Sequence, residues 1–431
     1  MNNTKFSSMA VAGALCAFAA LPSTAADVQV YGVIDTSLSF VSSDADVAGH
    51  DRVNTFSMEN AKEFGSRFGL RGSEDLGNGY KVGFVLESGF KSDDGQFDQT
   101  GKLFGREAHV DLTGPFGKVS AGVLPLFGST LGADGLFRAI DPLFANYTKA
   151  FGSSCISASS WTRVDNAISY VTPTFAGLTG YAMYSFKSSG LTTSTEGRGG
   201  ESDRYASVAA RYKAGAVEAI VVGDTTMYGT YRTGAAASKD DGWTVTVGGN
   251  YTFDGGVRLL AFTQFFGDQE LPAFRGGVGT DGIMAVTGGK GYGFVDGYGV
   301  SLGVNVPALG GVAKASIGYR DMENKIDVDF KRVIAALGYD YAISKRTAVY
   351  AMTGWSQEKV ETAAMEAKPN GYEFTAASFI DSDYQSSQRR QASCIEEPDA
   401  FFMSQRPSGL PCLDPLPSSM AVKILSIAGS L

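Results

Sequence analysis

The feature that most constrains this chain is a two-residue alternation of apolar and polar side chains in many short segments. Between Trp243 and Phe253, for example, tryptophan, valine, tyrosine and phenylalanine share one parity, while threonine and asparagine share the other. Successive side chains of a β-strand point to opposite faces. Such a segment therefore predicts a strand with one apolar face and one polar face.

Sixteen segments of this kind occur, and each is about as long as a tilted membrane-spanning strand, roughly 9–11 residues. Many of them begin or end in an aromatic residue, as expected for an aromatic girdle at a membrane interface. They cover residues 28–40, 66–73, 80–90, 106–113, 117–124, 163–171, 178–186, 204–213, 217–224, 243–253, 257–266, 299–306, 313–320, 331–341, 346–355 and 371–377.

The connections between these segments alternate between short and long. Two-residue links at 114–115 and 214–215 stand next to long links such as 125–162 and 267–298. An outer-membrane barrel has short turns on one side and long loops on the other, whereas a soluble sandwich has no reason to keep that order. The chain is therefore predicted to be all-β, a transmembrane antiparallel β-barrel of about 16 strands over residues 27–377.

The composition agrees with a barrel and excludes several other classes of protein. The 55 glycines and 47 tyrosines and phenylalanines suit many short strands with tight turns. A mean hydropathy of −0.03 is compatible with membrane strands, because half of each strand can be polar. The net charge of −9 argues against a nucleic-acid partner.

No catalytic or metal site is predicted from the sequence. Its two histidines, His50 and His109, stand in no metal-ligand spacing and near no nucleophile motif. The stretch 277–282 matches a dinucleotide pattern by letters only, because no strand precedes it and no helix pattern follows it. We therefore expect no enzymatic activity and no cofactor.

The first 26 residues are predicted to be a secretory signal peptide. Lys5 supplies a basic start, Met9–Leu21 is apolar, and Pro22–Ala26 offers small residues for cleavage. After Ala26 no stretch approaches the roughly 18 apolar residues of a transmembrane helix. An exported chain with this strand pattern is expected in a bacterial outer membrane.

Several segments, in the order in which they occur, resemble the general diffusion porins of Gram-negative proteobacteria. They are Asp27–Gly32, Gly65–Gly77, Leu103–Arg106, Arg163–Tyr170 and Ser344–Thr347. The resemblance implies a homotrimer of sixteen-stranded barrels that passes ions and small hydrophilic solutes by passive diffusion. It also implies that the third long loop, here residues 125–162, folds into the lumen and narrows it.

The same resemblance implies a charged constriction. Arg67, Arg106 and Arg163 occupy strand positions where family members place basic residues, and Asp134 and Asp141 lie on the loop opposite. Opposed charges across a narrow passage create a transverse field that discriminates between ions. The simpler interpretation is that the arginines are solvated wall residues and that the aspartates are ordinary loop acids.

Parity predicts which further residues line the lumen. Arg71, Lys81 and Glu87 lie on the polar faces of their strands and are expected to point inward. Arg106 is ambiguous, because it shares parity with apolar residues of its strand. Either it stands beyond the lipid belt, or its strand lies at a subunit interface.

Two other functions remain open besides a general diffusion pore. One is a solute-specific channel of the same fold, in which loop 125–162 carries the binding site. The other is a barrel with a structural or adhesive task. Outer-membrane lipid is an expected partner in every case.

Residues 378–431 form an atypical tail that departs from the family pattern. These 54 residues contain 5 of the 13 prolines but only 2 of the 55 glycines, and the alternation is lost. One hypothesis is an out-of-frame translation of a porin gene. The alternative is a flexible, disordered periplasmic extension in which Cys394 and Cys412 pair, since that compartment is oxidising. Cys155 then has no obvious partner.

Overall fold

The structure is a computed structural model that describes residues 27–144, 147–158, 162–198, 200–232, 240–271 and 278–381. The predicted signal peptide and residues 382–431 of the predicted tail lie outside the described residues. Across the described part of the chain, no helix is long and apolar enough to cross a membrane.

The described residues form one antiparallel sheet with very little helix. The strands are β1 (Asp27–Asp44), β2 (Val53–Asn60), β3 (Arg67–Gly77), β4 (Tyr80–Gly89), β5 (Glu107–Gly114), β6 (Gly117–Pro125), β7 (Arg163–Val171), β8 (Leu178–Ser185), β9 (Arg204–Ala214), β10 (Val217–Met227), β11 (Gly242–Thr252), β12 (Arg258–Leu271), β13 (Gly293–Ala308), β14 (Gly311–Asn324), β15 (Asp329–Ala342), β16 (Thr347–Glu361), β17 (Glu366–Ala367) and β18 (Asn370–Asp381). The helices are η1 (Leu136–Ala139), η2 (Ser153–Cys155) and α1 (Thr280–Val286).

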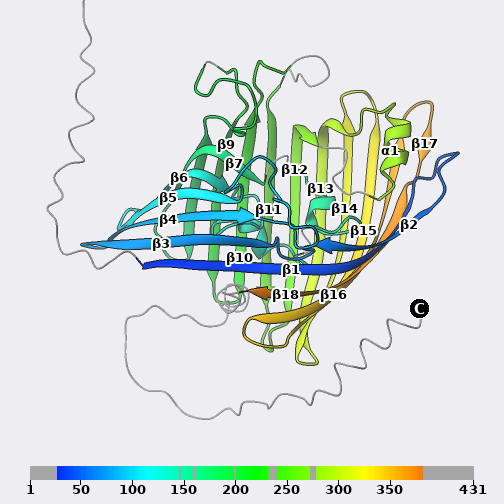
Figure 1. Ribbon diagram of the computed structural model, residues 1–431. Coiled ribbons are helices and arrows are strands. Elements are labelled where there is room, and N and C mark those ends of the chain that lie inside the picture. Colours follow the sequence, from blue (N-terminus) through cyan, green and yellow to red (C-terminus); the bar gives the residue numbers. More distant parts are fainter. Residues whose placement is uncertain are drawn as a thin grey trace, which may run out of the picture. The chain divides into compact units, whose positions relative to one another are not determined.

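The sheet closes into a barrel of sixteen strands, as predicted. β1 pairs with β18 at twelve positions, from Val33 opposite Asp381 to Asp44 opposite Asn370 (Figure 1). β2 and β3 pair with consecutive parts of β1 and together make one interrupted barrel strand. β17 adds only two residues beside β16. Closure leaves no open sheet edge along the seam between the first strand and the last.

The predicted alternation is present in the strands. In β11 the side chains of Trp243, Val245 and Val247 are exposed on the outer face, whereas Thr244 and Thr246 are buried on the inner face. An outer face of this kind suits contact with hydrocarbon. The polar inner face needs partners inside the barrel, and these come from the other strands and from the long loops.

The end of the last strand differs from that predicted. β18 ends at Asp381 rather than at Ala377, and its alternation weakens there because polar Ser378 faces outward and Phe379 is buried inside. The ring of Phe379 packs 4.7 Å from that of Phe64, which compensates for its inward position. The pairing with β1 therefore continues where the sequence pattern stops.

Another difference is a strand that was expected to be loop. β2 lies within the stretch 41–65 that the alternation left unassigned. It is separated from β3 by residues 61–66, which turn inward and are all buried. Because the interruption breaks the two-residue period, the sequence pattern detects only the β3 half of this barrel strand.

Candidate functional site

The long segment between β6 and β7 lies inside the barrel, against the inner faces of β11, β13 and β16. Glycines on those strands make the space for it. At each of them an added Cβ would come within 3.0 Å of a segment atom; the pairs are Gly248 with Ile140, Gly299 with Ile156, Gly303 with Pro142, and Gly354 with Phe151. The absence of side chains at these wall positions therefore lets the segment seat deeply.

A buried ionic cluster holds this segment to the wall on the side of β14–β16. Both oxygens of Glu358 accept hydrogen bonds, Oε1 from Arg320 Nη2 at 2.7 Å and Oε2 from Arg332 Nη2 at 2.6 Å. Arg332 also donates from Nη1 to the carbonyl of Cys155 at 3.1 Å. Tyr292, from the connection before β13, donates to Glu358 Oε2 at 2.5 Å. This carboxylate thus holds the loop before β13 directly and the long segment through Arg332.

A second anchor lies at the seam of the barrel. Glu373 of β18 accepts hydrogen bonds from the backbone N–H groups of Lys149 and Ala150 in the long segment. Its other oxygen pairs with Lys62 Nζ at 3.0 Å. A carboxylate that accepts several hydrogen bonds in a buried position is strongly held, and this one fixes the middle of the segment.

The three arginines predicted for the wall lie together around one carboxylate. Glu87 pairs with Arg106 Nε at 2.5 Å and with Arg67 Nε at 3.4 Å, and it accepts a hydrogen bond from the Tyr31 hydroxyl at 2.8 Å. Arg163 lies close enough to interact electrostatically with both Arg106 and Glu87. Two guanidinium groups therefore contact this carboxylate directly, and the third lies within electrostatic range of it.

Arg106 points into the barrel, which resolves its ambiguous parity. It stands one residue before β5 begins, so the alternation of that strand does not determine its direction. Gly65 makes the space for it: a Cβ there would lie 2.5 Å from Arg106 Nη1 and 2.6 Å from the hydroxyl of Tyr147. Tyr147 belongs to the long segment, so the arginine cluster and the segment meet at this point.

The two predicted loop carboxylates have other partners in the structure. Asp134 pairs with Lys118 of β6 at 2.5 Å. Asp141 is buried and accepts hydrogen bonds from Ser153 Oγ at 2.8 Å and from the N–H of Phe144 at 3.3 Å. Burial raises the pKa of Asp141, although these hydrogen bonds favour its charged form. The structure thus brings the three arginines together and gives each of the two aspartates a local partner.

The three further residues predicted to line the lumen have different roles. Arg71 donates to Gln29 Oε1 at 2.7 Å from Nη2 and stacks over the Tyr31 ring at 5.0 Å. Lys81 is exposed near the short-turn end of β4. Glu87, which the sequence places only on the polar face of its strand, is the centre of the arginine cluster.

Sequence reasoning missed the buried charges of the seam. Asp35 of β1 accepts hydrogen bonds from the N–H of Phe64 at 2.9 Å and from the hydroxyl of Tyr350 at 2.8 Å. Lys314 of β14 pairs with Glu63 at 3.0 Å and also with Asp340 of β15. Their only sequence signal is a polar residue at an inward position, which does not identify a partner.

No group of three or more potential metal ligands occurs among the described residues. The two histidines have acidic neighbours: His109 lies 3.1 Å from Glu107 and 3.0 Å from Asp111, and His50 lies 3.5 Å from Asp281. Cys155 is a free, buried thiol, and burial raises its pKa.

Comparison with known proteins shows relatives over most of the chain. A family model described as "Gram-negative porin" matches residues 7–360. An outer membrane porin protein of Bordetella pertussis is 29% identical over 374 residues, which are 80% of this chain and 93% of that protein. Outer membrane porin protein 32 of Delftia acidovorans is 31% identical over 352 residues, 79% of this chain and 87% of that protein.

Solved structures share the fold. An anion-selective porin from Comamonas acidovorans superposes with a TM-score of 0.60 at 24% identity, over 82% of this chain and 100% of that chain. The outer membrane protein OmpT of Vibrio cholerae, in its trimer form, gives a TM-score of 0.55 at 16% identity, over 82% of this chain and 99% of that chain.

Proposed function

Because this chain belongs to the Gram-negative porin family, we propose that Arg67, Arg106 and Arg163 set the ion selectivity of its channel. The channel is that of an outer membrane porin, through which ions and small solutes diffuse passively. The observation that carries the proposal is the gathering of three guanidinium groups around Glu87 at the edge of the inserted segment.

The charge count of this cluster favours anions. Arg67 and Arg106 contact Glu87 and Arg163 lies within electrostatic range of it, so the three arginines leave the cluster a positive excess over this carboxylate. Arginine retains its charge at any physiological pH. Fixed charges in a narrow passage raise the local concentration of ions of opposite sign. The relative of the same fold described as an anion-selective porin supports this direction.

The inserted segment supplies the other side of the proposed constriction. Its Tyr147 lies against Arg106, while Asp134 is partly exposed next to Lys118. We propose that the segment narrows the lumen, that Asp134 contributes to the acidic side of the field, and that Asp141 stabilises the shape of the segment. None of these roles requires catalysis, and we propose no enzymatic activity.

Reversal potentials across a planar bilayer with a potassium chloride gradient test the selectivity. The variant Arg67→Glu reverses one charge of the cluster, so its reversal potential is expected to shift toward that of a cation-selective pore. Lys331→Glu is the matched control, because Lys331 is an exposed, outward-facing residue of β15. An Arg67→Glu channel with the wild-type reversal potential would place Arg67 outside the field. Saturation of the current by one solute would instead favour the solute-specific channel.

We further propose that the channel is a homotrimer. β2 pairs with β1 along one edge, and the strand registers of the described residues give β2 no second partner strand. Its outward side chains include Phe56 and Met58, which are 71% and 59% exposed. An unpaired strand edge offers a template on which another chain can pair. The mass of the complex in mild detergent tests this, with Phe56→Asp expected to reduce the assembly to monomers.

The tail beyond the barrel is best explained, we propose, as an out-of-frame translation. The barrel closes with residues up to Asp381, so closure requires none of residues 382–431. Resequencing the 3′ end of the gene tests the idea. An intact reading frame, with the same tail present in purified protein, would argue for an evolved periplasmic extension.

A further inference from the structure

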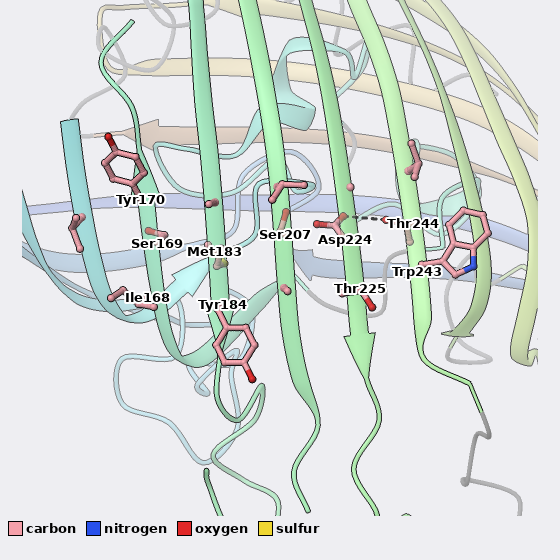
Figure 2. Close-up of a pocket in the computed structure, with 16 residues that line it drawn as sticks. Ile168, Ser169, Tyr170, Met183, Tyr184, Ser207, Asp224, Thr225, Trp243 and Thr244 are labelled. Carbon is pink, nitrogen blue, oxygen red and sulfur yellow. Dashed lines mark hydrogen bonds between the residues drawn. The ribbon is translucent and has the colours of Figure 1, made fainter. Parts of the chain in front are cut away.

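The outer face of the barrel carries an apolar groove over β7–β11. The groove has a volume of about 650 Å³. Its floor consists of small residues on adjacent strands, Ala182, Ala206 and Gly223, and large side chains such as Tyr184 and Trp243 line it. Figure 2 shows Tyr170, Tyr184 and Trp243 spaced across these neighbouring strands.

A second, more polar hollow adjoins the groove at the long-loop end of the same strands. It has a volume of about 270 Å³ and is lined by Arg198 and Arg204 together with Tyr184 and Phe186. The two rings pack edge to face, 5.0 Å apart. Tyr184 lines both hollows. Arg204 and Ala206 share one face of β9 two residues apart, so the two hollows lie roughly 7 Å apart along the strand.

Arg204 is a charged group for which the described residues supply no ion pair. It has no ion pair among the described residues, and its Nε is buried without a hydrogen-bond partner. Arg198 is 74% exposed and pairs only with Glu201, three residues away, at 3.2 Å. An exposed pair of this kind contributes little and exchanges readily. Both guanidinium groups can therefore receive an anion, and their planar fork matches a phosphate.

We propose that these two hollows together bind a phosphorylated lipid of the outer leaflet. The phosphate lies on Arg198 and Arg204, and one acyl chain lies along the small-residue floor of the groove. A basic pocket at the membrane interface, joined to an apolar groove that faces hydrocarbon, complements the two ends of such a lipid. A second copy of this chain would have to supply both an acidic and an apolar surface here, whereas the unpaired edge of β2 lies elsewhere on the barrel. The inference rests on the outer-membrane location and not on the proposed selectivity.

Native mass spectrometry of the full chain, released from detergent after incubation with lipid A, tests the site. Wild-type protein is expected to retain lipid A in preference to phosphatidylcholine. The double variant Arg198→Ala, Arg204→Ala is expected to bind it about tenfold more weakly, as for loss of a charge-assisted phosphate contact. Lys331→Ala is the matched control, because it removes an outward-facing cation at the long-loop end of β15, away from both hollows.

A groove-filling variant, Ala206→Phe, tests the acyl-chain half, and it is also expected to retain less lipid A. Equal retention by wild type and the double variant would overturn the proposal, as would equal retention of phosphatidylcholine. Displacement of lipid A by inorganic phosphate would reduce the site to an ion site and also overturn it. So would a change in subunit number in Ala206→Phe with lipid A retained, which would make the groove a protein contact. All variants are expected to keep wild-type conductance, which separates this test from that of the channel.

Discussion

Replacing Glu358 by glutamine should release the inserted segment from the wall. Glu358 is the only carboxylate that the described contacts give to Arg320 and Arg332, whose side chains are 0% and 1% exposed. Glutamine keeps the shape of the side chain but removes its charge. Two buried guanidinium groups then lose the carboxylate charge that both of them contact.

The expected magnitude follows from that burial. Removing one partner of a buried ion pair typically costs about 3–5 kcal/mol, because the remaining charge stays desolvated. Each 1.4 kcal/mol changes an equilibrium about tenfold, so the seated form of the segment should lose on the order of 10²- to 10³-fold in population relative to displaced forms. The change is transmitted through Arg332, which holds the carbonyl of Cys155.

Single-channel recording in planar bilayers measures the outcome. The Glu358→Gln channel is expected to be noisier than wild type and to enter conductance levels above the wild-type level. The unfolding temperature of the barrel in the same detergent should fall. Glu361→Gln is the matched control on β16, since Glu361 forms an exposed pair with Lys359 that is worth about 0–1 kcal/mol.

An unchanged conductance, noise level and unfolding temperature in Glu358→Gln would refute the reasoning. It would mean that the two arginines gain solvent or another partner without moving the segment. An equal effect in Glu361→Gln would also refute it, because the loss would then reflect the charge of the strand and not the buried cluster.

Two further predictions concern the same segment. Gly354→Ala places a Cβ against the ring of Phe151 and should destabilise the seated segment by about 1–3 kcal/mol. The single-channel conductance of this variant should therefore rise. Gly338→Ala is the control, because its Cβ would make only ordinary van der Waals contacts and its conductance should equal that of wild type. The second prediction uses protein that lacks Cys394 and Cys412, so that Cys155 is the thiol tested. Burial of Cys155 and its raised pKa should prevent maleimide labelling at neutral pH, whereas labelling should be faster in Glu358→Gln. Rapid labelling of Cys155 without the Glu358 substitution would contradict the buried position of this thiol.

The outward-facing residues of the strands could be predicted from the sequence, because contact with lipid favours apolar side chains at those positions. The alternation located each of the sixteen barrel strands. It failed where the backbone leaves the two-residue period, at the interruption 61–66, and where inward and outward residues lose their contrast, at Ser378–Asp381. Both failures lie beside β1, the first between its partners β2 and β3 and the second on its partner β18.

The inner half could not be predicted in the same way, because its partners come from distant parts of the chain. Asp35 and Tyr350 are 315 residues apart, and Glu63 and Lys314 are 251 apart. Parity places Asp35 and Lys314 inside but does not say which other strand each faces, and it does not apply to Glu63, which lies in the interruption 61–66. The resemblance located the three arginines, yet the central place of Glu87 appears only when β3, β4 and β5 lie side by side.

The interruption at 61–66 explains why the seam needs buried polar groups. Backbone groups at membrane depth must be satisfied within the protein. Here the Tyr350 hydroxyl accepts from the N–H groups of Lys62 and Glu63, at 3.2 and 3.1 Å, while Asp35 accepts from that of Phe64 at 2.9 Å. Side chains of β1 and β16 therefore replace hydrogen bonds that an unbroken strand would have made along the ladder.

The interruption also joins the two ends of the chain. By turning inward, residues 61–66 carry Lys62 to Glu373 of β18 and Glu63 to Lys314 of β14. Breaking the second barrel strand therefore gives up a few ladder hydrogen bonds but adds ion pairs across the closure. Because Glu373 also holds the backbone of Lys149, closure of the barrel and seating of the segment depend on the same carboxylate. Closure of the barrel at β18 and seating of the inserted segment should consequently occur together.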